Sequence, residues 1–397
     1  MTSRIDFLTQ PEVKEFIREN VNVDPNKLIL NPPAAFRANI KEIAGQILSR
    51  QKAKGKLDSW ASNFDIIMPP PLSIEQASSE ATSHYKGKLL TGDHLIDLTG
   101  GMGIDCLSLS ESFKRTTYLE RDSDLCEVFS HNLKALNRKI EVINSNANDY
   151  LEAHSFDKNK TMVYMDPARR DPNKNRVFRI EDCSPNLIEL MSALSKNASQ
   201  VLVKYSPLLD ISSLTNAIEH IKELHVVSVK NDCKELLLLI NFSSTNDPQI
   251  KCVNLESNQS VFSFSMQEEH SASPVYGDYR PFVYESNSSI MKAGAFNQVA
   301  EVYDVIKLAN NTHLYTSDKM IESFPGRIYR IIDTVNKQSI KTYATNGKIN
   351  VITRNYPLSP QELKKKWKLR DGGKYYLLAF RDRSNKPQMV IATRFDD

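Results

Sequence analysis

The sequence predicts an α/β protein in which a central sheet of alternating strands and helices follows a helical region and precedes an α+β module. Two observations carry this prediction. The glycine-rich stretch Asp97–Asp105 lies between the apolar pair Leu95-Ile96 and the amphipathic segment Ile104–Phe113, an arrangement typical of strand, turn and helix. Further apolar strands alternate with helix-like segments as far as residue 242, which indicates a mainly parallel sheet.

The composition is that of a globular protein with roughly two to four domains. Of the 397 residues, 40% are hydrophobic and 25% are charged, both ordinary values. No apolar run reaches the length of a membrane span and the first residues form no signal peptide, so we expect a cytoplasmic protein with no membrane partner. Five cysteines are spread without a Cys-x-x-Cys pair, and we therefore expect neither a metal site nor a disulfide framework.

The turn after Asp97 is compared with three kinds of cofactor-binding loop. A Walker loop needs a lysine after its last glycine, and a dinucleotide fingerprint needs a third glycine where Cys106 stands. The remaining pattern, an acid at a strand end followed by Gly-x-Gly, resembles motif I of class I S-adenosylmethionine-dependent methyltransferases. On this resemblance the cofactor-binding candidates of the turn are Asp97, Thr99, Gly101 and Gly103.

Two further strand ends carry residues suited to the same cofactor. The predicted strand Thr117–Glu120 ends in Glu120, whose carboxylate can accept both ribose hydroxyls. The predicted strand Ile140–Ile143 is followed by Asn146 and Ala147, at the place where such enzymes hold an acid or amide against the adenine edge. A solvated strand end and a turn residue are the ordinary alternatives, but the order of these signals favours the cofactor.

The predicted strand Met162–Met165 runs into Asp166-Pro167-Ala168-Arg169. This string resembles motif IV, an Asp/Asn-Pro-Pro-x element beside the transferable methyl group, and with motif I it implies a Rossmann-like, seven-stranded methyltransferase sheet. Asp166, Pro167 and Arg169 are the catalytic candidates, and Asp166 would also bond the amino group of the methionine moiety. Arg169 would stack on a base or bond a phosphate, although a surface salt bridge explains it equally well.

The cysteines bear on the acceptor atom. A C5-pyrimidine methylase needs a catalytic cysteine on the motif IV loop or the following loop, and residues 166–172 and 204–210 contain none. The nearest, Cys183, falls on a predicted helix. We therefore expect the methyl group to go to a base nitrogen, which needs no covalent nucleophile.

The segment Leu72–Lys88 lies just before the glycine turn, where many methyltransferases place a helix over the methionine end of the cofactor. Its polar candidates are Gln76, Thr82 and Lys86. The triple proline at 69–71 marks a boundary before this segment, and Ser243–Pro248 is a linker by composition. We expect a helical region at 1–72, a methyltransferase domain at 73–245 and C-terminal domains at 250–325 and 326–397.

In the C-terminal part, Ser289–Lys307 predicts a helix pair or one long helix, and Ser359–Lys368 a short helix that begins with a Ser-Pro cap. Leu377–Phe380 and Met389–Ala392 predict a closing hairpin. The densest basic run of the chain lies on the Ser-Pro helix. Its ordinary explanation is a solvated helix face, and its alternative is contact with an RNA backbone, for which the candidates are Lys364, Lys365, Lys366, Lys368 and Arg370.

Most of the chain after residue 70 resembles a family of RNA methyltransferases in which the methylase domain precedes a ferredoxin-like and a THUMP-like domain. THUMP domains generally deliver structured RNA to an attached modification domain. The resemblance thus implies S-adenosylmethionine as cofactor and structured RNA, either tRNA or rRNA, as partner. It is carried by Asp97–Asp105, Leu119–Asp122, Tyr164–Arg170, Lys204–Asp210, Tyr284–Phe296, Leu314–Arg327 and Leu369–Gly373.

The methylase motifs are also similar to a bacterial small-subunit rRNA guanine-N2 methyltransferase, which has an acid two residues after its Gly-x-Gly, as Asp105 is here. This similarity implies that Asp105, Glu120, Arg121 and Asp166 touch the cofactor. Ala168-Arg169 departs from the residues that follow Asp-Pro in that family, so the target base stays open.

The hypothesis is a methyltransferase that acts on a base nitrogen of tRNA or rRNA. Two alternatives remain: an RNA-binding protein that keeps the fold without catalysis, and a methyltransferase of proteins or small molecules. The first alternative predicts no methyl transfer, and the second predicts weak RNA binding with little dependence on salt. The acceptor atom, the RNA and the oligomeric state stay open.

Overall fold

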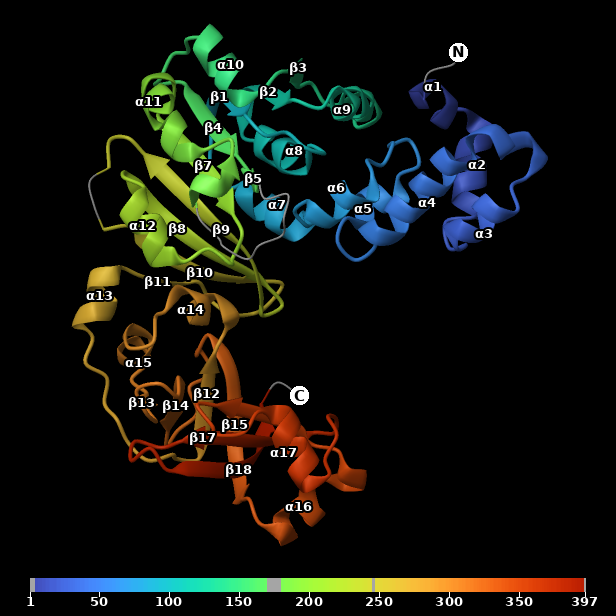
Figure 1. Ribbon diagram of the computed structural model, residues 1–397. Helices are drawn as coiled ribbons and strands as arrows, with labels where there is room; N and C mark the ends of the chain where they lie inside the picture. The colour runs from blue at the N-terminus through green and yellow to red at the C-terminus, as the bar shows by residue number, and fades with distance from the viewer. Residues whose placement is uncertain (1–3, 170–179, 245–246, 396–397) are drawn as a thin grey trace. The chain divides into compact units, whose positions relative to one another are not determined.

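The computed structural model describes residues 4–169, 180–244 and 247–395 and divides the chain into two compact units (Figure 1). Unit 1 comprises Met1–Lys222 and Leu237–Asn246, and unit 2 comprises Glu223–Leu236 and Asp247–Asp397. The chain therefore passes from one unit to the other after residues 222, 236 and 246. Among the helices of the described ranges, none combines the length and the apolar character that crossing a membrane requires.

The N-terminal part of unit 1 is helical, as predicted. In α4 (Ile40–Ala53), Ile40, Ile43 and Ile47 recur at helical spacing and are buried together with Val13. This apolar stripe holds the short helices around it. They are α1 (Arg4–Leu8), α2 (Pro11–Glu19), α3 (Pro25–Leu30), the 3-10 helix η1 (Ala34–Asn39) and α5 (Asp58–Ser62).

Arg50 ties the end of α4 to the chain that follows it. Its side chain is almost fully buried, and burial lowers the pKa of its guanidinium to about 10. The positive charge is met by backbone oxygens, since no carboxylate bonds it among the described residues. The guanidinium donates to the carbonyl oxygens of Trp60, Ala61, Asn63 and Ile66 at 2.6–3.3 Å.

The predicted seven-stranded arrangement is confirmed, as seven adjacent strands of a nine-stranded sheet. Its strands follow the order β3 (Glu141–Asn144), β2 (Phe113–Glu120), β1 (Gly92–Asp97), β4 (Thr161–Met165), β7 (Gln200–Tyr205), β9 (Asp232–Asn241) and β8 (Ile221–Val229). The ladders that join β3, β2, β1, β4 and β7 are all parallel. The C-terminal ends of these five strands therefore meet at one edge of the sheet, which is where an open α/β sheet binds its ligands. Two further strands, β10 (Gln249–Leu255) and β11 (Phe262–Phe264), follow β8 in the order.

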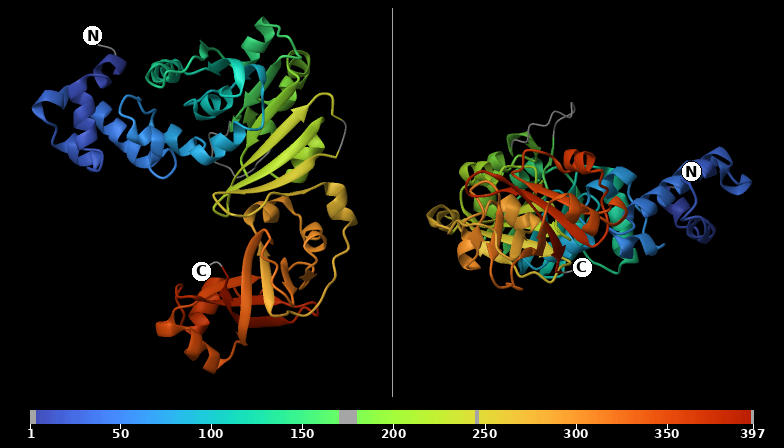
Figure 2. Two further views of the ribbon diagram at one scale, coloured as in Figure 1. Left: turned by 180° about the vertical axis from the view of Figure 1, so that it is seen from behind. Right: turned by 90° about the horizontal axis from the view of Figure 1, so that it is seen from below.

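Helices cover both faces of this sheet in unit 1, as Figures 1 and 2 show. The helices α7 (Glu80–Lys86), α8 (Ile104–Ser110) and α9 (Ser123–Ala135) lie on one face, and α10 (Ala147–Ala153), α11 (Leu187–Asn197) and α12 (Ile211–Ala217) on the other. Side-chain caps set several helix starts. Asp122 accepts from two backbone N–H groups of α9, and Asp210 accepts from one in α12.

Three sequence-based assignments in unit 1 were wrong. The helix expected over Ile104–Phe113 ends at Ser110 because Phe113 pairs with Gly92 as the first residue of β2. The helix expected within Leu72–Lys88 is two helices, α6 (Pro71–Gln76) and α7, because Ser79 caps α7 by accepting from the Thr82 amide. Cys183 lies in a strand pair, β5 (Ala168–Arg169) with β6 (Cys183–Ser184), rather than on a helix. Pro185 follows this pair, and a residue before proline disfavours the helical conformation.

Unit 2 contains a seven-stranded sheet, which includes the predicted hairpin. Its last two strands in the chain, β17 (Tyr375–Arg381) and β18 (Pro387–Arg394), pair antiparallel. The full order is β13 (Ile306–Lys307), β14 (Leu314–Ser317), β12 (Phe282–Ser286), β15 (Gly326–Thr334), β18, β17 and β16 (Asn350–Arg354). The helix pair expected over Ser289–Lys307 is α14 (Ser288–Ala293) and α15 (Gln298–Val302), but Ile306 and Lys307 form β13 instead. The helix α13 (Met266–Ser271) precedes them.

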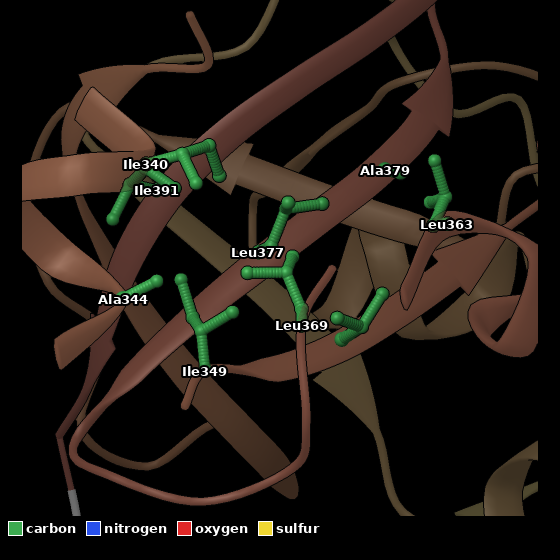
Figure 3. Close-up of a cluster of buried hydrophobic side chains, with 9 residues drawn as sticks. Ile340, Ala344, Ile349, Leu363, Leu369, Leu377, Ala379 and Ile391 are labelled. Atoms are coloured by element: carbon green, nitrogen blue, oxygen red, sulfur yellow. The ribbon is translucent and has the colours of Figure 1, made fainter. Parts of the chain in front are cut away.

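Two helices, α16 (Lys337–Tyr343) and α17 (Pro360–Trp367), share a buried cluster with β17 and β18. Figure 3 shows Ile340 beside Ile391 and Leu369 beside Leu377. The predicted Ser-Pro cap of α17 is confirmed, because Ser359 and Glu362 form a reciprocal capping box. Two 3-10 turns, η2 (Ile180–Asp182) and η3 (Thr345–Gly347), complete the elements.

Candidate cofactor and active site

The glycine turn begins where β1 ends at Asp97 and leads into α8. Gly101 has φ +57° and Gly103 has φ +84°, conformations in which an L side chain is strained. A Cβ on Gly103 would lie 2.0 Å from the Phe129 ring, whereas a Cβ on Gly101 would meet nothing closer than 3.8 Å. Gly103 is thus required for packing as well as for conformation, and the main chain at Gly101 borders open space.

Asp97 is buried at the tip of β1, with a side chain about 1% exposed. Its Oδ1 accepts from the Thr99 amide at 2.9 Å, while its Oδ2 receives no hydrogen bond from any residue that the structure describes. Burial raises the pKa of Asp97 to about 8 against the opposing effect of the Thr99 amide. An unsatisfied buried carboxyl group fits a cationic partner, because such a partner would restore the charged form. The amino group of a methionine moiety is a partner of this kind.

Glu120 stands at the tip of the neighbouring strand β2 and is bonded to the turn. Its Oε2 accepts from the Gly101 amide at 2.8 Å, and its Oε1 accepts from the Asp122 amide at 2.9 Å. Each carboxylate oxygen has two acceptor positions, so both oxygens keep room for a hydroxyl group. Arg121 follows as an exposed residue.

Asn146 and Ala147 lie after β3, at the next strand end, but the Asn146 side chain has a structural task. It caps α10 by accepting from the Asp149 amide at 3.0 Å, and its Nδ2 donates to Asp149 Oδ2 at 2.6 Å. Ala147 is buried. The Asn146 amide is therefore held within the chain, but its oxygen and its Nδ2 each keep one further hydrogen-bonding position for an adenine edge.

Asp166 follows β4 and is locked to the glycine turn. Its backbone N–H donates to Thr99 Oγ1 at 2.6 Å, and its carboxylate is about one-third exposed. Pro167 is buried beside it. Arg169 belongs to β5 by its backbone, but its side chain lies outside the described part of the chain. A hydrogen bond thus joins the end of β4 to the turn that follows β1.

Asp105, on the first turn of α8, is surrounded by residues that the sequence analysis did not bring together. Its Oδ2 accepts from Ser78 Oγ and from the Tyr164 hydroxyl, each at 2.7 Å. Lys86 Nζ lies 3.3 Å from Oδ1, and Lys204 Nζ lies 3.6 Å from Oδ2. Burial alone would raise the pKa of Asp105, but the two ammonium groups and the two hydroxyls outweigh it and lower this pKa below its ordinary value. Asp105 is therefore an ionised carboxylate held inside the domain.

Lys204 joins this buried cluster to the exposed part of the site. Its Nζ lies 2.5 Å from Asp166 Oδ2 and 3.1 Å from Ser78 Oγ. Ser78 lies between α6 and α7, and its hydroxyl oxygen also accepts from Lys86 at 3.1 Å. Of the three polar candidates before the turn, Lys86 is buried in this cluster, Thr82 is buried at the start of α7 and Gln76 is exposed. Two signals could have identified Lys204: it ends the apolar run Val201–Lys204, and it begins the string Lys204–Asp210 that carries part of the family resemblance.

The predicted RNA-binding run lies on α17 and the residues after it. Lys365, Lys366, Lys368 and Arg370 are exposed, whereas Lys364 is paired with Asp371 at 2.6 Å. Lys368 ends the helix with φ +54°. Four of the five candidates thus present cations on one short stretch of unit 2.

Comparisons with known proteins agree with this architecture. A family model described as a ferredoxin-like domain matches residues 282–325, and one described as THUMP domain-like matches residues 326–394. A crystal structure described as a candidate methyltransferase from Porphyromonas gingivalis W83 is 31% identical, with a TM-score of 0.85, over 97% of this chain and 98% of that chain. Two curated Mycobacterium tuberculosis proteins, from strains CDC 1551 and H37Rv, are 25% identical over 193 residues. They are described as uncharacterized S-adenosylmethionine-dependent methyltransferases, and the match spans about half of their length.

The strand order and the acids at the tips of β1, β2 and β4 define a class I methyltransferase domain. The matches to ferredoxin-like and THUMP domain-like models in the C-terminal part place the chain in a smaller group within this class. The chain belongs to the family of the Porphyromonas gingivalis protein, the class I S-adenosylmethionine-dependent methyltransferases with C-terminal ferredoxin-like and THUMP-like domains.

Proposed function

We propose that the protein binds S-adenosylmethionine at the ends of β1, β2 and β4 and transfers its methyl group to a base nitrogen of structured RNA, either tRNA or rRNA. The observation that carries this proposal is the hydrogen bond from the Asp166 amide to Thr99 Oγ1 at 2.6 Å. It brings the acid of the predicted motif IV beside the turn of the predicted motif I, because β4 and β1 are neighbours in the sheet.

In the proposed binding site, the end of each strand contributes polar groups that bind a different part of the cofactor. The cofactor supplies an electrophilic methyl group on a positively charged sulfur, and the chain supplies orientation and the charge environment. Asp97, through its unbonded Oδ2, and Asp166 would accept from the methionine amino group, and Glu120 would accept from the ribose hydroxyls. Gly101 lets the backbone approach closely. Thr99, Gly103 and Asp105 would hold this frame, with Arg121, Asn146 and Ala147 at its border.

Asp166 and Pro167 are the proposed catalytic residues, together with Arg169. The Asp166 carboxylate is bonded to Lys204 through Oδ2 only, so within the described residues its Oδ1 stays available as an acceptor. An exocyclic amine on a base could donate to this oxygen and be oriented for in-line attack. The base nitrogen would form its bond to the methyl carbon as the carbon–sulfur bond breaks, and its proton would pass to Asp166 Oδ1 or to water, with no covalent intermediate on the chain.

The RNA part of the proposal rests on the C-terminal module. The THUMP domain-like match over 326–394 supports it, because THUMP domains generally deliver structured RNA to an attached modification domain. The exposed cations Lys365, Lys366, Lys368 and Arg370 in the same module support it as well, since phosphate contacts supply most of the affinity for nucleic acids. The division at residues 72, 245 and 325 is part of the same proposal.

Two measurements test this function with the full-length chain. Calorimetric titration with S-adenosylmethionine should give binding by the wild type, and Asp166→Asn should keep most of it. Transfer of a labelled methyl group to tRNA or rRNA from a strain that lacks the gene should fall about 100-fold or more in Asp166→Asn. Nucleoside mass spectrometry of the two RNA fractions then names the acceptor.

The outcomes separate the alternatives. A wild type that binds RNA without binding the cofactor would be an RNA-binding protein without catalysis. A wild type that binds the cofactor but methylates neither RNA fraction, and binds RNA without salt dependence, would act on a protein or a small molecule.

A further inference from the structure

Glu285 holds two arginine side chains in unit 2. It lies on β12 with a side chain about 4% exposed. Its Oε2 accepts from Arg327 Nη1 at 3.2 Å, and its Oε1 accepts from Arg354 Nη2. Arg327 faces Glu285 across the β12–β15 ladder, whereas Arg354 ends β16, the last strand in the sheet order. The two arginines thus come from strands that are not neighbours and meet on one carboxylate.

The arginine pair keeps most of its hydrogen-bonding capacity and an excess positive charge. Each guanidinium carries five N–H donors, and both side chains are 38% exposed. Besides its bond to Glu285, Arg354 donates from Nη1 to the Thr353 carbonyl at 2.8 Å. One carboxylate neutralises only one of the two cations.

Two arginine side chains held in place by Glu285 suit a phosphate group better than mobile surface arginines do. Binding normally orders flexible side chains at a cost in conformational entropy, but the buried carboxylate already holds both guanidinium groups. The planar guanidinium fork matches the geometry of phosphate oxygens. Because Oε1 and Oε2 belong to one carboxylate, the two guanidinium groups are close enough to contact one phosphate together.

We propose that Arg327 and Arg354, held by Glu285, form a binding site for a backbone phosphate of the RNA. The inference rests on the proposed function, since RNA is the source of that phosphate, and adds a site outside the basic run on α17. A purely structural ion pair is the competing explanation. It predicts a loss of stability on substitution and no change in RNA binding.

The test measures the affinity of the full-length protein for a fluorescently labelled tRNA transcript between 50 and 300 mM KCl. In Arg327→Gln and Arg354→Gln we expect binding about fivefold to tenfold weaker near 0.1 M salt, with a salt slope smaller by about 0.7–0.9 for each arginine. The matched control is Arg280→Gln, which removes an exposed cation paired with Asp318 in the same unit. This control should keep the wild-type slope. A competition arm with inorganic phosphate distinguishes free phosphate from RNA, because at equal ionic strength millimolar phosphate should not displace the RNA.

Folded glutamine variants with wild-type affinity and slope overturn the inference, and so does full displacement by phosphate. Should a glutamine variant not fold, the variants Arg327→Lys and Arg354→Lys distinguish the phosphate site from a purely structural ion pair. A lysine keeps the charge but not the fork, so the salt slope should remain while affinity falls about threefold; wild-type affinity in both lysine variants overturns the inference. A wild type that binds neither this transcript nor an rRNA fragment at 50 mM KCl overturns the proposed RNA function itself.

Discussion

Lys204 Nζ lies 2.5 Å from Oδ2 of Asp166, and the two residues continue the β4–β7 ladder beyond its last pair, Met165 with Val203. The parallel sheet thus places a cation directly beside the acid of the predicted catalytic motif. The same ammonium group lies near Asp105, so Lys204 and Lys86 together balance the buried carboxylate of Asp105 and the partly exposed carboxylate of Asp166.

Replacement of this lysine tests its role as counter-ion. Lys204→Met should lower the free energy of unfolding at pH 7 by about 2–4 kcal/mol, because Asp105 loses one of its two cations and its pKa rises. The lowered pKa of Asp105 contributes stability above the ordinary pKa of an aspartate, near 4, which is lost as the pH falls below it. The variant should therefore lose less stability than the wild type on acidification. Urea unfolding at pH 3, 5 and 7 measures this, and Lys204→Arg is the matched control. A Lys204→Met protein as stable as the wild type would contradict the prediction.

For Asp97 we expect the free energy of unfolding to depend on pH in the opposite direction. Its pKa in the folded protein, about 8, lies above the value near 3.9 of an unfolded chain, so the folded state binds the additional proton between these values. The free energy of unfolding therefore decreases as the pH rises from 4 to 8, because ionisation of Asp97 is more costly in the folded protein than in the unfolded chain. Asp97→Asn should remove this decrease, which makes the variant more stable relative to the wild type at pH 8 than at pH 5, by an amount on the order of 3–5 kcal/mol. Asp124→Asn, an exposed control, should keep the wild-type slope. Parallel curves for Asp97→Asn and wild type would refute the assignment.

The two glycines of the turn should respond differently to an added methyl group. Gly103→Ala combines a left-handed backbone with a contact of 2.0 Å to Phe129, and should cost about 3 kcal/mol or more. Gly101→Ala meets open space and should cost only about 1–2 kcal/mol from its backbone conformation. Thermal unfolding with and without S-adenosylmethionine compares the pair. Equal losses of stability would show that Phe129 moves away without cost.

Arg50 should be among the most sensitive residues of the N-terminal helices. Arg50→Met removes the guanidinium donor from four carbonyl oxygens, of which that of Trp60 keeps the Asn63 amide, so we expect a loss of about 3–5 kcal/mol in the free energy of unfolding. Arg37→Met, at an exposed position, is the control and should change stability by less than about 0.5 kcal/mol. Urea unfolding followed by circular dichroism measures both. A small effect at Arg50 would mean that water replaces the guanidinium.

Local patterns were enough to find the tips of the strands. Asp97, Glu120 and Asp166 each follow a short apolar run, and parallel strands bring such ends to one edge. The cluster around Asp105 was not predictable in this way. Ser78 and Lys204 are 126 residues apart in the chain, and no spacing rule links them. Their meeting depends on how α7 packs against α8, which the sequence does not encode locally.

Residues with two possible roles were also hard to assign. Asn146 is typical both of an adenine-binding position and of a helix cap, and the structure shows the cap. The end of α8 was misplaced because Phe113 fits the apolar face of a helix as well as a strand, and only the pairing with Gly92 decides.

The division of the hairpin β8–β9 between the units has a practical consequence for genetic dissection of the protein. The polar linker after residue 242 suggests a cut there, yet Glu223–Leu236 lies before the cut and belongs to unit 2. A fragment ending at residue 246 would carry β8 without β10, the strand with which it pairs in parallel. The complementary fragment would expose the unpaired edge of β10, and an exposed strand edge promotes aggregation. Each unit should therefore be studied by point substitution in the intact polypeptide, since truncation would damage both halves at once.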